Sequence, residues 1–158
     1  MLGVWNEQHC YPIAKDFFEM PNRFWYMGDI PHGWACAEFM MLLRDILFFE
    51  ADEDGDAQLY VAPGVMPHWL GEGETIGVAE APTVFGSKFG YRLTHRPSAR
   101  RVDITITRPP PAHVRFVYPC RFGTGVQAAT ANGHAVPVFG RDVHLPRGAT
   151  TATITYNP

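Results

Sequence analysis

The sequence predicts a mainly β protein, an antiparallel β-sandwich of seven to nine strands with one long N-terminal helix packed against it. From residue 58 onward apolar residues alternate with polar ones, and turn signals recur roughly every eight to twelve residues. Only residues 31–50 form a long run with helical periodicity. We therefore expect two parts: an aromatic-rich N-terminal segment with the helix, residues 1–57, and a β-sandwich domain, residues 58–158.

The composition excludes two classes of partner. The 158 residues carry a net charge of −3 and no basic run longer than Arg100-Arg101, so the chain lacks the basic surface typical of nucleic-acid binding. Glu38, Arg44 and Asp45 interrupt the apolar helix, which argues against a membrane span. Residues 1–7 lack the regions of a signal peptide, so we expect a cytoplasmic protein.

The predicted helix, residues 31–50, is the longest element. Asp29 is a candidate N-cap, and Pro31 fits the first turn, where its missing N–H costs nothing. The helix is apolar nearly all round, and each large apolar side chain left in water forgoes about 1.5 to 3 kcal/mol. It therefore needs a cover on both faces. The sandwich supplies one, and residues 1–30, a second copy of the chain or a missing domain supplies the other; we expect a homo-oligomer through this helix.

The strands follow from period-two alternation between turn signals. Asn132-Gly133 predicts a two-residue hairpin turn, and Pro109–Pro111 must connect two strands because proline cannot pair in a central strand. Residues 63–71 are expected to form a loop with one helical turn. The expected strands are residues 58–62, 75–79, 88–94, 102–107, 114–118, 125–131, 134–139, 143–145 and 150–156.

Three carboxylates at alternate positions, Asp52, Asp54 and Asp56, follow the predicted helix. Calcium is bound by oxygen ligands of this kind. The run is not a complete EF-hand loop, because Gly55 is fourth rather than sixth and the twelfth position is Pro63 instead of glutamate. Two interpretations stay open, a solvated turn or a calcium site, and calcium is the only cofactor to which the sequence points.

A second group of candidates lies on the helix. Trp34, Glu38 and Asp45 share one stripe, and His32 lies at its start. Carboxylates hold sugar hydroxyls and protonate leaving oxygens, while an aromatic face stacks on a sugar ring. The pattern makes Glu38 and Asp45 catalytic candidates and His32 and Trp34 substrate-binding candidates. The alternative is that both carboxylates pair with arginines or with solvent.

Four motifs together resemble, in order and spacing, the C-terminal end of helical-toroid glycoside hydrolases of the α-L-rhamnosidase-like group. They are Gly28–Glu38, Leu59–Val65, Trp69-Leu70 and Ala81–Gly86. The resemblance implies a last toroid helix followed by a closing β-sandwich, with His32 and Trp34 bordering a sugar pocket. In such enzymes the acid and base come mainly from toroid helices upstream, and this chain starts almost where the toroid ends.

His68 and Trp69, in the loop that carries the third motif, are further substrate-binding candidates. Two functions are therefore open. The first is a glycoside-hydrolase-related β-sandwich module or remnant, structural or in contact with carbohydrate. The alternative is a small calcium-dependent hydrolase of esters or lactones, for example acyl-homoserine lactones, in which Glu38 or Asp45 activates water. Either function implies a small-molecule or carbohydrate ligand.

Overall fold

The computed structural model describes residues 33–158, and the chain divides after Leu43 into two compact units. The described part contains one α-helix and eleven strands, which confirms the mainly β prediction. The elements are helix α3 (Gly33–Leu47), β1 (Phe48–Glu53), β2 (Asp56–Val61), the 3-10 helix η2 (Pro67–Trp69), β3 (Thr75–Pro82), β4 (Lys88–Arg96), η3 (Pro97–Ala99), β5 (Arg101–Arg108), β6 (Arg115–Pro119), β7 (Gly125–Ala131), β8 (His134–Ala135), β9 (Val138–Phe139), β10 (Asp142–Leu145) and β11 (Thr151–Asn157).

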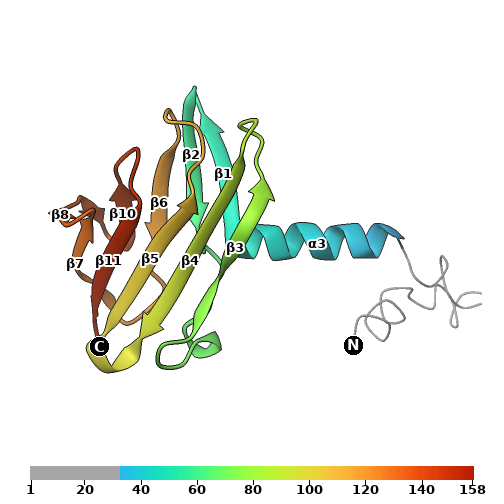
Figure 1. The fold of residues 1–158 in the computed structure, drawn as a ribbon. Coiled ribbons are helices and arrows are strands. Elements are labelled where there is room, and N and C mark those ends of the chain that lie inside the picture. The colour runs from blue at the N-terminus through green and yellow to red at the C-terminus, as the bar shows by residue number, and fades with distance from the viewer. Residues whose placement is uncertain (1–32) are drawn as a thin grey trace, which may run out of the picture. The chain divides into compact units, whose positions relative to one another are not determined.

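The strands form two sheets (Figure 1). One has the order β1-β2-β6-β10-β9 and the other the order β3-β4-β5-β11-β7-β8. The pairing is antiparallel except between β2 and β6, which run parallel with Gln58 opposite Arg115. A parallel pair requires a long crossover connection, and here the whole β3–β5 meander of the other sheet lies between the two strands.

The core lies between the sheets and is built from alternate residues of each strand, as the period-two pattern predicts. In β2 the residues Ala57, Leu59 and Val61 are buried and their neighbours are half-buried. Phe89 stands at the centre, with its ring 5.5 Å from that of Tyr91 and 5.9 Å from that of Phe116. In residues 33–158 no helix combines the length and apolar character that crossing a bilayer requires.

The predicted end of the helix is wrong. The helix ends at Leu47, and strand β1 starts at Phe48. Phe48 is 2% exposed, Phe49 is 46% exposed and the Glu50 side chain is buried again, which is the two-residue period of a strand. Adjacent apolar residues fit a helix equally well, so composition did not mark the change. The sandwich therefore begins at β1, ahead of the predicted boundary at residue 58.

The acidic run after the helix is the tip of the β1–β2 hairpin. Glu53 pairs with Asp56, so Asp54 and Gly55 form the two-residue turn. Both have positive φ, 53° and 81°, which is the backbone that Asp-Gly favours in hairpins. The prediction of a turn from helix to strand is corrected to a turn between two strands.

The last turn of α3 is fixed to the sandwich. The Leu47 carbonyl oxygen accepts hydrogen bonds from the Ala62 N–H (2.8 Å) and the Tyr91 hydroxyl (2.6 Å), and the Ile46 carbonyl accepts one from the Gly64 N–H (3.0 Å). These donors satisfy carbonyls that a helix end otherwise leaves unpaired. Gly64 is required here, because a Cβ at this residue would lie 2.9 Å from the Ile46 Cα.

Candidate functional site

The two predicted catalytic residues lie on the same helix. Both Glu38 and Asp45 lie on α3 and are exposed. They are seven positions apart, which is a rise of roughly 10 Å along the helix axis. His32 lies outside the described residues, and only the backbone of Trp34 is described, as part of α3. The sugar pocket predicted around them stays a prediction.

Asp45 borders an apolar hollow of about 430 Å³ on the five-stranded sheet. Its neighbours there include the rings of Phe49 and Tyr60, whose centroids are 6.2 Å apart. The hollow contains no second carboxylate or histidine. The Asp45 carboxylate lies instead 3.7 Å from the Arg44 guanidinium, so this hollow lacks the partner that acid–base chemistry needs.

His68 and Trp69 lie next to each other on η2, with their rings edge to face at 6.2 Å. Both are exposed, and neither lines the hollow that Asp45 borders. The structure thus places these two predicted substrate-binding residues apart from the apolar hollow, without further aromatic rings packed on them among the described residues.

The carboxylates of the β1–β2 hairpin are not gathered into a metal site. Asp56 accepts a hydrogen bond from the Gln58 amide (3.0 Å) and forms an ion pair with Arg115. Across residues 33–158 no three His, Cys, Asp or Glu side chains stand close enough together to hold a metal ion. The geometry gives the calcium hypothesis for Asp52, Asp54 and Asp56 no support, since the hairpin turn accounts for the acidic run.

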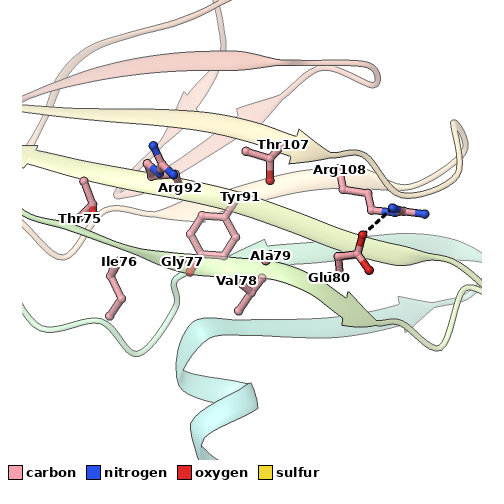
Figure 2. A pocket seen from close by; sticks show the side chains of 10 residues that line it. All are labelled: Thr75, Ile76, Gly77, Val78, Ala79, Glu80, Tyr91, Arg92, Thr107 and Arg108. Carbon is pink, nitrogen blue, oxygen red and sulfur yellow. Dashed lines mark hydrogen bonds and ion pairs between the residues drawn. The ribbon is translucent and has the colours of Figure 1, made fainter.

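The candidate site is a polar hollow of about 560 Å³ on the six-stranded sheet, which we call the β3–β5 hollow (Figure 2). No residue predicted from the sequence as a site residue lines it. Side chains and backbone from three neighbouring strands line the hollow: Thr75, Ile76, Gly77, Val78, Ala79, Glu80, Tyr91, Arg92, Thr107 and Arg108.

Two β-bulges create this hollow, one on either side of Gly90. Along β3 the register shifts between Val78 and Ala81, so that Ala79 and Glu80 together oppose Gly90. Along β5 the register shifts at the same level, and Thr107 is the extra residue. Bulges bend a strand and redirect its side chains, and they are common beside functional sites. The pair of bulges brings Glu80, Thr107 and Arg108 to one end of the hollow.

Two glycines allow the strands to approach closely here. A Cβ on Gly77 would lie 2.0 Å from the Tyr91 carbonyl oxygen, and one on Gly90 would lie 2.3 Å from that of Ala79. Neither backbone oxygen can move without breaking the sheet, so both positions require glycine. These two glycines within predicted strands are the sequence signal that could have indicated the site.

Cationic side chains outnumber carboxylates at the hollow. The Glu80 carboxylate is bonded to the Lys88 ammonium (2.8 Å) and to the Arg108 guanidinium (2.9 Å). The hydrogen bond from Lys88, helped by the charges of both cations, lowers the pKa of Glu80, so this carboxyl is ionised at neutral pH. Arg92 is exposed and has no carboxylate partner within the described part of the chain. The hollow thus offers hydroxyls, one neutralised carboxylate and a free guanidinium.

A comparison of the chain with protein-family models, with curated proteins and with solved structures finds no match. We therefore infer function from the geometry of the β3–β5 hollow and of its surroundings.

Proposed function

We propose that the chain is a non-catalytic β-sandwich module that contacts carbohydrate, of the kind that closes helical-toroid glycoside hydrolases. The observation that carries this proposal is the β3–β5 hollow. Its volume of about 560 Å³ is in the range of small-ligand sites, about 300 to 1,000 Å³. Its lining combines Thr75 and Thr107 hydroxyls, a carboxylate and guanidinium groups, which are the donors and acceptors that sugar hydroxyls need.

The same lining favours binding over catalysis. Glycoside hydrolysis uses two carboxyl groups, one of them a general acid with a raised pKa. Glu80 is the only carboxylate in the hollow, and its pKa is lowered by Lys88 and Arg108. A carboxylate that holds no proton at neutral pH serves as a hydrogen-bond acceptor for a ligand rather than as a proton donor.

A structural role of the module is supported by the end of helix α3. Its last turn is hydrogen-bonded to the sandwich through Ile46 and Leu47. The preceding turn carries exposed apolar side chains, Met40 (64%), Met41 (60%), Leu42 (54%) and Leu43 (37%). These four residues are consecutive, so they point to different sides of the helix, and exposed apolar surface of this extent is typical of a protein–protein contact. The end of the helix is thus held by the sandwich, while the turn before it exposes apolar side chains. This arrangement suits a module that packs these side chains against another protein surface.

Titration of the purified chain with neutral and acidic oligosaccharides tests the function. We expect calorimetric binding, together with no hydrolysis of aryl glycosides or acyl-homoserine lactones, with calcium or with chelator. The Thr107→Val variant removes one hydroxyl from the hollow and is expected to weaken binding about threefold, as the loss of one neutral hydrogen bond does. Thr130→Val, on β7 of the same sheet, is the matched control. Hydrolysis above the spontaneous rate, or no binding of any saccharide, contradicts the proposal.

We also expect the chain to self-associate through α3. Light scattering after size exclusion is expected to give a mass above the 17.7 kDa of one chain. Met41→Glu places a charge among the exposed apolar residues of the helix and is expected to shift the mass toward a single chain, because burying an unpaired carboxylate is costly. Met66→Glu, at a 48% exposed methionine outside the helix, is the control. A monomeric wild type, or equal effects of both variants, contradicts this expectation.

A further inference from the structure

The β3–β5 hollow has more positive charge than its own carboxylate neutralises. Two cationic side chains, Lys88 and Arg108, pair with Glu80, and a third, Arg92, lines the same hollow, although the whole chain has a net charge of −3. Lys88 and Arg108 share Glu80 as their partner. The excess therefore lies at Arg92, which stands toward the other end of the hollow, near Thr75 (Figure 2).

No carboxylate of the sheet is available to Arg92. Asp103 lies two residues along the neighbouring strand, since Arg92 pairs with Thr105. That carboxylate already accepts hydrogen bonds from Arg96 (3.1 Å), Arg101 (3.1 Å) and Thr153 (3.1 Å). The N–H donors of the planar Arg92 guanidinium are therefore available to a bound molecule.

The backbone around Arg92 keeps its guanidinium accessible. On β3 the residue opposite Arg92 is Gly77, which has no side chain to cover it. A side chain there is excluded by the Tyr91 carbonyl, 2.0 Å from the position that a Cβ would take. The glycine that the close strand pairing requires is therefore also the residue that leaves the hollow open beside Arg92.

We propose that the β3–β5 hollow binds an acidic oligosaccharide built of hexuronate units, with a ligand carboxylate on Arg92 beside Thr75 and the hydroxyls of the next sugar unit on Thr107 and Glu80. This inference rests on the proposed function and adds the class of ligand. Guanidinium matches a carboxylate with two parallel hydrogen bonds, and charge-assisted bonds of this kind are about twice as strong as neutral ones. The carboxylate of Glu80 and the threonine hydroxyls match a polyhydroxylated ring. Neutral sugars leave Arg92 unmatched.

Calorimetric titration with digalacturonate, compared with neutral galactobiose, tests this inference. We expect digalacturonate to bind at least about fivefold more tightly at low salt, and this preference to shrink as salt is added. Arg92→Gln is expected to weaken digalacturonate binding about tenfold and to leave galactobiose unchanged, since one charge-assisted bond is worth about 1.5 kcal/mol or more. Arg147→Gln, at an exposed arginine of the turn at residues 146–148, removes the same charge elsewhere and is expected to change neither affinity.

The outcomes separate the two proposals. Equal affinity for both sugars, or an equal effect of Arg92→Gln and Arg147→Gln, overturns the hexuronate inference and leaves carbohydrate binding intact. Binding of neither sugar overturns the hexuronate inference, and binding of no saccharide in the wider titration overturns the proposed function as well. Inorganic sulfate at the same ionic strength distinguishes a site for any anion: if sulfate displaces digalacturonate at equal concentration, the hollow recognises the charge alone and the sugar assignment is overturned.

Discussion

Replacing Glu50 by alanine is expected to lower the unfolding free energy of the sandwich by about 3 kcal/mol. Removing this carboxylate takes away the buried partner of a partly buried cation. The Glu50 side chain is 4% exposed and forms an ion pair with Arg44 from the last turn of α3. Its other oxygen accepts the Val84 N–H at 2.7 Å. Alanine at this position leaves the Arg44 guanidinium, which lies over the Phe48 ring at 4.4 Å, with only the exposed Asp45 carboxylate at 3.7 Å.

Denaturant unfolding monitored by circular dichroism measures the effect. Asp45→Ala is the matched control, because it removes an exposed carboxylate that lies 3.7 Å from the same arginine. An exposed pair contributes about 0 to 1 kcal/mol, so this control is expected to change stability little. In a double-mutant cycle with Arg44→Ala, a coupling energy near zero would show that the Glu50–Arg44 pair does not hold the helix end to the sandwich.

The regular strands could be predicted from the sequence because a half-buried strand shows apolar and polar residues in strict alternation. In β5, for example, Val102, Ile104 and Ile106 are buried while the residues between them face outward. The same reasoning failed at the end of α3. Leu47, Phe48 and Phe49 are all apolar, so the local pattern fits both periods, and only pairing with β2 decides between them.

The candidate site was not predictable for a different reason. Its lining comes from three strands, and its shape depends on where the register shifts between Val78 and Ala81 and at Gly90. A register shift depends on how two strands pair, so it does not alter the alternation of apolar and polar residues in the sequence of either strand. The carboxylates that the sequence singled out, Glu38 and Asp45, share a helical stripe, but a stripe by itself does not show which groups of other elements lie opposite it.

Alkali is expected to unfold the sandwich steeply above pH 10. Tyr91 and Tyr118 are 2% and 1% exposed, and burial raises the pKa of both side chains above the ordinary value near 10. Above pH 10 the unfolded chain therefore binds fewer protons than the folded chain, and stability falls as pH rises. Each tyrosine contributes about 1.4 kcal/mol per pH unit, so the two together contribute about 2.7 kcal/mol. Below pH 10 their contribution is constant.

The Tyr118→Phe variant tests this origin of the alkaline transition. Within residues 33–158 the buried Tyr118 hydroxyl has no strong hydrogen-bond partner and interacts only with the Cys120 thiol, a weak hydrogen-bonding group, so phenylalanine removes a titrating group at the loss of that weak contact. We expect unfolding free energies, measured in urea from pH 9 to 11.5, to fall with pH less steeply in the variant by about 1.4 kcal/mol per unit. At pH 7 the variant is expected to be at least as stable as the wild type, since it removes a buried hydroxyl whose contact with the Cys120 thiol is weak. Parallel pH profiles for the two proteins would mean that Tyr118 ionises before the fold opens, and that the core does not exclude its charge.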